Sequence, residues 1–138
     1  MKVTHIPFVQ HVGIEHKDEK TLQLEATKEV KNHIDTIHAS AQFTLAESQS
    51  GLFLQQLFPE YVREVVPLLR SSSLKYKAPA LKDIYATATV SNEEKEKFLT
   101  RFTKKGRATI VVNVEIKDSD EVLTMQGEFN WFVQKLEL

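Results

Sequence analysis

Residues 39–58, ASAQFTLAESQSGLFLQQLF, combine hydrophobic and small side chains in a helical pattern. Apolar and small positions recur at spacings of three and four, and three leucines extend the apolar surface until it covers most sides. The recurring positions are Phe43, Ala46, Ser50, Phe53 and Leu57, and the leucines are Leu45, Leu52 and Leu54. This pattern predicts a buried helix of roughly 19 residues, about 28 Å long, that ends before Pro59.

Most other segments alternate between hydrophobic and polar positions, which predicts half-buried strands. These segments cover residues 8–16, 21–30, 71–78, 84–90, 107–117 and 121–135. The polar residues 17–20 predict a turn that makes the first two segments antiparallel neighbours. Residues 60–69 fit either a short helix or a loop, because Pro67 interrupts a regular element.

A second helix is predicted between the fourth and fifth strands, at residues 91–105. The segment opens with Ser91 and Glu94 in the spacing of a capping box, and Gly106 follows it as a helix C-terminus prefers. Its apolar stripe is narrow, which is typical of a surface helix, and consists of Phe98, Leu99 and Phe102.

The order of these elements predicts one α+β domain that spans residues 1–138. Two strands, the long helix, two strands, the short helix and two strands follow one another along the chain. We expect a six-stranded antiparallel sheet that wraps around the long central helix. A length of 138 residues is sufficient for a single domain with a real core.

Composition excludes several classes of function. Hydrophobic residues make up 41% and charged residues 27% of the chain, with a net charge of −1, so bulk charge does not favour nucleic-acid or membrane binding. There is no cysteine and no stretch like a signal peptide, which leads us to expect a soluble, cytoplasmic protein. The five histidines lack metal-ligand spacing, and no phosphate loop, dinucleotide fingerprint or nucleophile elbow occurs, so no metal or cofactor is expected.

Glu47 is the only charged residue in residues 39–58. Its neighbours at three and four residues along the helix cannot form an ion pair with it. A carboxylate removed from water has a raised pKa, which suits a general base. Alternatively, Glu47 faces solvent or a partner at a subunit interface.

The chain resembles the hotdog-fold acyl-CoA thioesterases, within them the group related to phenylacetic-acid-pathway and 4-hydroxybenzoyl-CoA thioesterases. In NHIDTIHASAQFTLAE, the residues Asn32, His38 and Glu47 match the family pattern Asn-x-x-Gly-x-x-His-Gly-Gly and Leu-Ala-Asp/Glu. The segments LKYKAPALKD and GRATIVVNVEIKDSDEVLTMQGEF resemble later strands of the family. Asp35 replaces a glycine of the pattern, residues 39–40 (Ala-Ser) replace Gly-Gly, and residues 81–83 lack a turn glycine.

The resemblance implies hydrolysis of acyl-CoA or a related acyl thioester. The Ala39 N–H, at the start of the central helix, is implied as the oxyanion donor. Glu47 is implied as general base or as nucleophile through an anhydride. Asn32 is implied to orient the water or the thioester carbonyl; alternatively, it is a turn residue. His38 is implied to donate a hydrogen bond to the thioester; alternatively, it caps the helix.

Further residues are implied around the substrate. Ser71 or Ser73, at the start of the third strand, would position the water, or they simply begin the strand. Basic residues are candidates for the phosphates of coenzyme A, which enters only as part of the substrate, or they form a solvated face. These residues are Lys75, Lys77, Lys104, Lys105 and Arg107.

The resemblance also implies an assembly and leaves alternatives for function. Two sheets would join edge to edge in a homodimer, possibly a dimer of dimers that forms a homotetramer. A different hypothesis is a non-catalytic hotdog module that binds an acyl thioester or a protein partner, motivated by Asp35, Ala39 and Ser40. A dehydratase-type hotdog enzyme is a third reading, but its His and acidic placement does not occur here.

Overall fold

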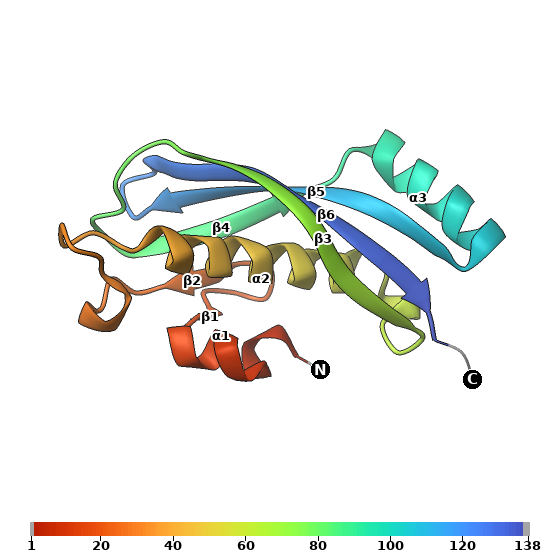
Figure 1. Cartoon of the computed structure of the whole chain (residues 1–138), viewed down its shortest axis with the longest axis horizontal. Helices are drawn as coiled ribbons and strands as arrows, with labels where there is room; N and C mark the ends of the chain where they lie inside the picture. Colours follow the sequence, from red (N-terminus) through yellow and green to blue (C-terminus); the bar gives the residue numbers. More distant parts are fainter. Residues whose placement is uncertain (1, 137–138) are drawn as a thin grey trace.

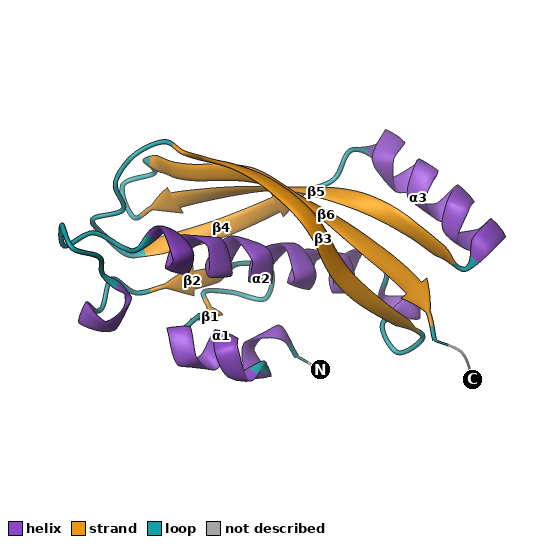
Figure 2. Ribbon diagram, viewed as in Figure 1, coloured by secondary structure: helices purple, strands orange, loops and turns teal. Residues whose placement is uncertain are grey.

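The structure, a computed structural model, describes residues 2–136 and consists of one antiparallel sheet and a long helix (Figures 1 and 2). The six strands follow the order β1-β2-β4-β5-β6-β3, and every neighbouring pair is antiparallel. Their bounds are β1 Glu15–His16, β2 Leu22–Leu24, β3 Val65–Tyr76, β4 Ile84–Thr89, β5 Arg107–Asp118 and β6 Leu123–Lys135. The predicted α+β hotdog architecture is thus confirmed.

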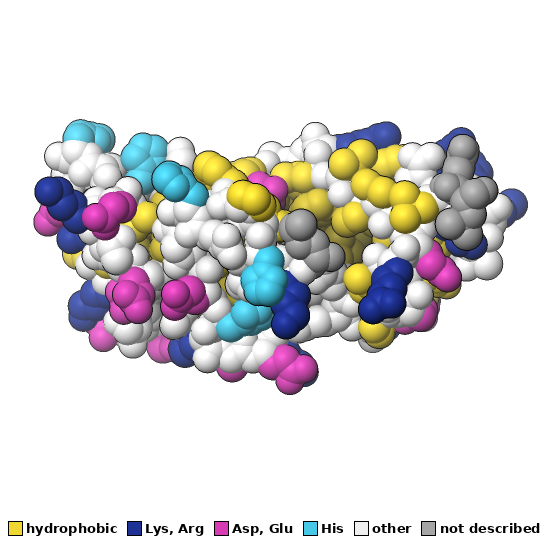
Figure 3. All heavy atoms as spheres, turned by 90° about the horizontal axis from the view of Figure 1, so that it is seen from below, with side chains coloured by type: hydrophobic (Ala, Val, Ile, Leu, Met, Phe, Trp, Pro, Cys, Tyr) yellow, Lys and Arg dark blue, Asp and Glu magenta, His cyan; other side chains and the backbone are white. Residues whose placement is uncertain are grey.

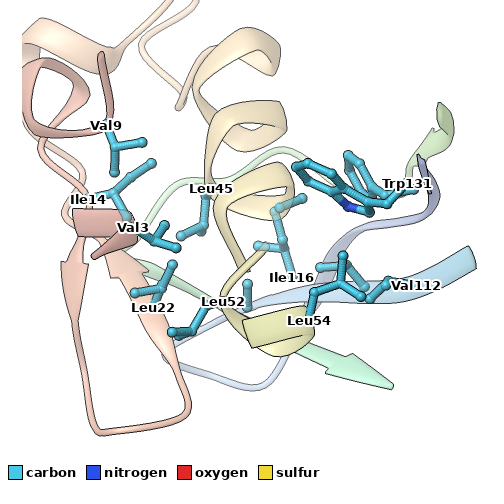
Figure 4. Packing of buried hydrophobic residues seen from close by; sticks show 14 of the residues in the cluster. Val3, Val9, Ile14, Leu22, Leu45, Leu52, Leu54, Val112, Ile116 and Trp131 are labelled. Carbon is cyan, nitrogen blue, oxygen red and sulfur yellow. The ribbon is translucent and has the colours of Figure 1, made fainter. Parts of the chain in front are cut away.

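The central helix α2, Ala39–Leu57, has the predicted length of 19 residues. One side packs on the sheet, and the opposite side is covered by the N-terminal segment, which contains η1 Val3–His5 and α1 Pro7–Val12 (Figures 1 and 4). Leu45 and Ala46 are completely buried. Apolar contact on two opposite sides explains why the helix has apolar residues around most of its circumference.

The first predicted strand is largely wrong. Residues 7–12 form α1, and only Glu15–His16 is a strand. Pro7 occupies the first turn and Gly13 adopts a left-handed conformation with φ of 95°, which are the usual start and stop of a helix. The second predicted strand is shorter than expected, since only Leu22–Leu24 pairs and η2 Lys28–Val30 follows. The predicted antiparallel pairing of the two segments is confirmed.

Strand β3 begins earlier than predicted and includes Pro67. Among residues 2–136 its only neighbour in the sheet is β6, so one of its edges is open. Proline lacks a backbone N–H, and an edge strand tolerates this because only one side needs ladder donors. The register shifts between Leu69 and Ser71, which leaves Arg70 as a bulge.

The predicted helix between β4 and β5 is confirmed as α3, Asn92–Lys105. The Ser91 side chain accepts a hydrogen bond from the Glu94 N–H, and Gly106 adopts a left-handed conformation. The last β4–β5 pair is Thr89 with Asn113, so the edge of β5 is uncovered beyond it. There the Glu94 carboxylate accepts a 2.8 Å hydrogen bond from the Val111 N–H, which holds α3 against β5.

Candidate functional site

The N-terminus of α2 is capped by its preceding residue. The Nδ1 atom of His38 accepts a 2.9 Å hydrogen bond from the Ser40 N–H, and the His38 backbone is extended. Because Nδ1 is an acceptor, the neutral ring carries its proton on Nε2, which leaves an exposed donor. His38 therefore caps the helix, while donation of a hydrogen bond from its side chain to a thioester stays a prediction.

The Ala39 N–H lies in the first turn of α2 and makes no hydrogen bond within residues 2–136. The first N–H groups of a helix have no intrahelical partner, and the positive end of the helix dipole lies beside them. Ala39 is exposed, so its N–H is available to an anionic oxygen of a ligand.

Asn32 organises the loop that leads into α2. Its Oδ1 accepts hydrogen bonds from the N–H groups of Ile34 and Thr36, at 3.1 and 3.0 Å, and its Nδ2 donates to the Thr36 hydroxyl at 2.8 Å. The acceptor is thus fully used within the loop, and one amide hydrogen remains. Asp35, where the family pattern has glycine, adopts a φ of 63°, which explains the preference for glycine at this position.

Glu47 lies on the side of α2 that faces β6 and the edge strand β3. One turn before it, the ring of Phe43 packs on Phe129 of β6, with 5.7 Å between centroids. One turn after it, the Trp131 Nε1–H donates a 2.9 Å hydrogen bond to the Ser50 hydroxyl. Since both flanking turns contact β6, Glu47 is directed toward the same strands.

The Glu47 carboxyl is half-buried and has no ion-pair or hydrogen-bond partner among residues 2–136. Burial raises its pKa above the ordinary value of 4.5. Ser50 does not compensate the charge, because its hydroxyl donates to the Glu47 backbone carbonyl at 2.7 Å. An unpaired carboxylate with a raised pKa is a candidate proton acceptor.

Tyr76, which the sequence analysis missed, joins the edge strand to this helix. Its hydroxyl donates a 3.1 Å hydrogen bond to the Ala39 carbonyl, and burial raises the pKa of the phenol. The alternation of β3 contained a clue, because Tyr76 has the parity of the apolar Leu74. Tyr76 therefore fixes the first peptide of α2 relative to the sheet.

The structure separates the three serines of β3. Ser71 pairs with Asn130 and Ser73 with Glu128, and these positions lie on the sheet face away from α2. Ser72 pairs with the buried Phe129 and thus lies on the helix side, near the level of Glu47. The favoured serines, Ser71 and Ser73, therefore do not share a face with Glu47. Counting back from Leu74 would have selected Ser72.

The basic candidates form two separate groups. Lys75 and Lys77 flank Tyr76, at the end of the sheet where α2 begins. Lys105 is the last residue of α3 and Arg107 the first residue of β5. Together with Lys104 they lie at the opposite end of the sheet. Gln126 of β6 pairs with Lys75 on one side and with Glu115 of β5 on the other, so Glu115 marks the level of Lys75 in the sheet. Arg107 is about 26 Å from Glu115 along β5, at 3.3 Å per residue. One subunit therefore does not bring both groups to one phosphate.

An apolar cavity of about 280 Å³ lies near the C-terminal half of α2, where Figure 3 shows hydrophobic side chains gathered around a hollow. It begins one turn beyond Glu47, at Gly51. Its lining comes from α2, β3, β6, α3, η3 (Pro59–Tyr61) and the N-terminal segment. The lining residues are Ile6, Gly51, Leu54, Gln55, Phe58, Tyr61, Val62, Val65, Pro67, Phe98, Phe102 and Val133.

Residues 2–136 contain neither a metal-binding cluster nor a membrane-spanning helix. No group of three or more His, Asp or Glu side chains is arranged to hold a metal ion. No helix combines the length and the apolar character that crossing a membrane requires.

Three solved structures share this fold over nearly the whole chain. A protein of unknown function from Pseudomonas aeruginosa, described as a probable thioesterase, is 22% identical with a TM-score of 0.83, covering 97% of this chain and 91% of its own. A Bacillus halodurans protein crystallised with CoA is 17% identical, with a TM-score of 0.71 and coverage of 91% and 74%. A Shewanella oneidensis protein whose description also names a thioesterase is 13% identical, with a TM-score of 0.77 and coverage of 95% and 90%.

At these identities the likeness establishes the hotdog fold rather than an activity. No curated protein sequence is significantly similar to the chain. Residues 4–133 match the family described as "Domain of unknown function (DUF4442)", and the chain belongs to this family.

Proposed function

We propose that the protein is a thioesterase that hydrolyses acyl-CoA or a related acyl thioester. The observation that carries this proposal is the half-buried Glu47 carboxyl, which lacks a partner within residues 2–136 and lies on the same helix as the free Ala39 N–H. A base and an oxyanion donor are the two groups that hydrolysis of a thioester needs most. The CoA bound to the Bacillus halodurans relative supports this class of substrate.

In this mechanism Glu47 removes a proton from water, and the hydroxide adds to the thioester carbonyl carbon. The Ala39 N–H stabilises the resulting oxyanion. The carbon–sulfur bond then breaks, and the thiolate leaves and takes up a proton. Alternatively, the Glu47 carboxylate adds to the carbonyl and expels the thiolate, and water hydrolyses the anhydride. A single turnover in ¹⁸O-labelled water tests the anhydride route, because label enters Glu47 only when water adds to the Glu47 carbonyl carbon of an anhydride.

The two groups act on one thioester only if they come from different subunits. Glu47 follows Ala39 by eight residues, which places them about 12 Å apart along the helix axis. We therefore propose a homodimer in which each site combines Glu47 of one subunit with the Ala39 N–H of the other. The open edge of β3, twelve residues long, supports pairing with a second copy. The exposed Leu68 on the outer face supports further association into a dimer of dimers.

The Glu47→Gln variant tests the proposal, because glutamine has the shape of glutamate without its basicity. We expect kcat on a panel of acyl-CoAs to fall by about 10²-fold or more. Glu115→Gln is the matched control, since Glu115 is exposed on β5 and is expected to leave kcat unchanged. Turnover by Glu47→Gln at the wild-type rate would refute the proposal.

A non-catalytic module that binds an acyl thioester is the second candidate. The observation that favours it is Asn32, whose side-chain oxygen already accepts two hydrogen bonds within its own loop and is not free to accept one from a water. This candidate predicts that acyl-CoA raises the melting temperature without release of thiol, whereas the thioesterase predicts both effects.

A further inference from the structure

The cavity beyond Glu47 is suited to an extended apolar group. Its walls are mainly hydrophobic side chains from different elements, including Leu54 of α2, Val65 of β3, Val133 of β6 and Phe98 of α3. Binding pockets of proteins are typically lined in this way, because burial of apolar surface supplies most of the affinity. The occupant should thus be an apolar group without charge.

The cavity lies one turn along α2 from the candidate catalytic carboxyl. Gly51 lines it and follows Glu47 by one helical turn, about 6 Å along the axis. Only the Trp131 ring would contact a Cβ atom at position 51, at 3.7 Å. Glycine at position 51 therefore adds no side chain to the part of the cavity wall nearest Glu47.

The far wall consists of aromatic rings in mutual contact. Phe98 lies 5.0 Å from Phe58 and 5.4 Å from Phe102, and Phe102 lies 5.0 Å from Tyr61, between ring centroids. Two of these rings belong to α3, which the Glu94–Val111 hydrogen bond holds against β5. A wall fixed in this way limits the length of a group that enters from Glu47.

We propose that this cavity receives the acyl group of the substrate, and that the substrate is a thioester of a medium-length acyl chain; the inference rests on the proposed function. A cavity of about 150 Å³ holds one benzene molecule, so by proportion about 280 Å³ accommodates roughly ten carbon atoms. Short acyl groups leave the cavity partly empty, and long chains meet the aromatic wall.

Hydrolysis of saturated acyl-CoAs from acetyl to stearoyl tests the chain length. Each methylene buried in the cavity is expected to raise kcat/KM about fourfold. The increase should continue to roughly ten carbons, and longer chains should then be hydrolysed less efficiently. An optimum at acetyl, or a profile independent of length, would overturn the inference.

Two substitutions that fill the cavity from opposite walls test its location. Leu54→Phe on α2 and Val65→Phe on β3 should each move the optimum to shorter chains. Val65 is on an edge strand and is only half-buried, so this variant remains informative if Leu54→Phe does not fold. The matched control is Leu57→Phe, on α2 but outside the cavity lining, which should not change the optimum. An unchanged optimum in both filling variants would contradict the assignment.

Titration calorimetry with decanoate separates this inference from the proposed activity. Wild type and Glu47→Gln should both bind decanoate, and both filling variants should bind it at least tenfold more weakly. Binding that survives both filling variants would overturn the cavity assignment alone. Wild-type turnover by Glu47→Gln would overturn the proposed hydrolysis alone.

Discussion

The Tyr76 hydroxyl donates a 3.1 Å hydrogen bond to the carbonyl oxygen of Ala39. This contact ties the open-edged strand β3 to the first turn of the central helix, where the N–H group of the same residue has no acceptor within residues 2–136. The edge strand and the candidate oxyanion donor are therefore positioned together, so pairing of β3 with a second copy would also affect the helix terminus.

Tyr76→Phe should reduce kcat several-fold while KM changes little, because the Ala39 peptide loses its anchor to β3 but keeps its N–H. The free energy of unfolding should fall by about 0.5–1 kcal/mol, the usual contribution of a partly exposed hydrogen bond. Steady-state kinetics and urea denaturation measure both effects. The β4 variant Tyr85→Phe, which removes a hydrogen bond from Tyr85 to Glu121, is the control for a general loss of stability. An unchanged kcat in Tyr76→Phe would show that the anchor has no role in turnover.

Ser72→Ala and Ser73→Ala should differ in activity although the residues are adjacent. The bulge at Arg70 places Ser72 on the helix side and Ser73 on the outer side of β3. If Ser72 positions the water, its loss should lower kcat about tenfold, which corresponds to one hydrogen bond. Ser73→Ala should retain the wild-type kcat, and the reverse order of effects would argue against this register.

Glu47 should make stability depend on pH in a defined direction. Folding raises the pKa of its carboxyl above 4.5, so the folded protein binds this proton more tightly than the unfolded chain. The resulting stabilisation is complete below pH 4.5 and is lost as pH rises through the folded-state pKa. At pH 7 Glu47→Gln should therefore be more stable than wild type, by less than about 1 kcal/mol because solvent screens the half-exposed group.

Denaturation of both proteins across this pH range measures the difference, which should shrink on acidification. A difference that grows as pH falls would mean that Glu47 has a stabilising partner. In the same range, kcat of wild type should rise with pH as the carboxyl ionises, with a midpoint above 4.5.

Asp35 should tolerate glycine better than any β-branched residue. Its φ of 63° is accessible to glycine without strain, whereas valine in this conformation costs about 1–2 kcal/mol. The free energy of unfolding of Asp35→Gly should thus lie within about 0.5 kcal/mol of wild type. The variant loses only the 3.4 Å ion pair between Asp35 and Lys31, which is on the surface. Asp35→Asn is the control for that ion pair. Equal stability of the glycine and valine variants would contradict the left-handed conformation.

Sequence by itself determined the elements whose starts and stops are encoded locally. The central helix ends before Pro59, and α3 begins at the Ser91 cap and ends at Gly106, because these residues satisfy or terminate the backbone hydrogen bonds of their own helix. The isolation of Glu47 was likewise visible, since it is the only charged residue among residues 39–58, but its half-buried position was not decided by the sequence.

Only the tertiary structure decided which side chains meet. The sequence of residues 8–16 predicted a strand, but residues 7–12 form helix α1, which packs on α2. Pro67 is compatible with a strand because β3 is at the edge, which its own sequence does not reveal. A one-residue bulge at Arg70 places Ser72 on the helix side of β3 and Ser71 and Ser73 on the outer side. The cavity is lined by residues of α2 and α3 that are far apart in the chain. Strand position, register and cavity shape depend on contacts between distant segments, and local propensity does not encode such contacts.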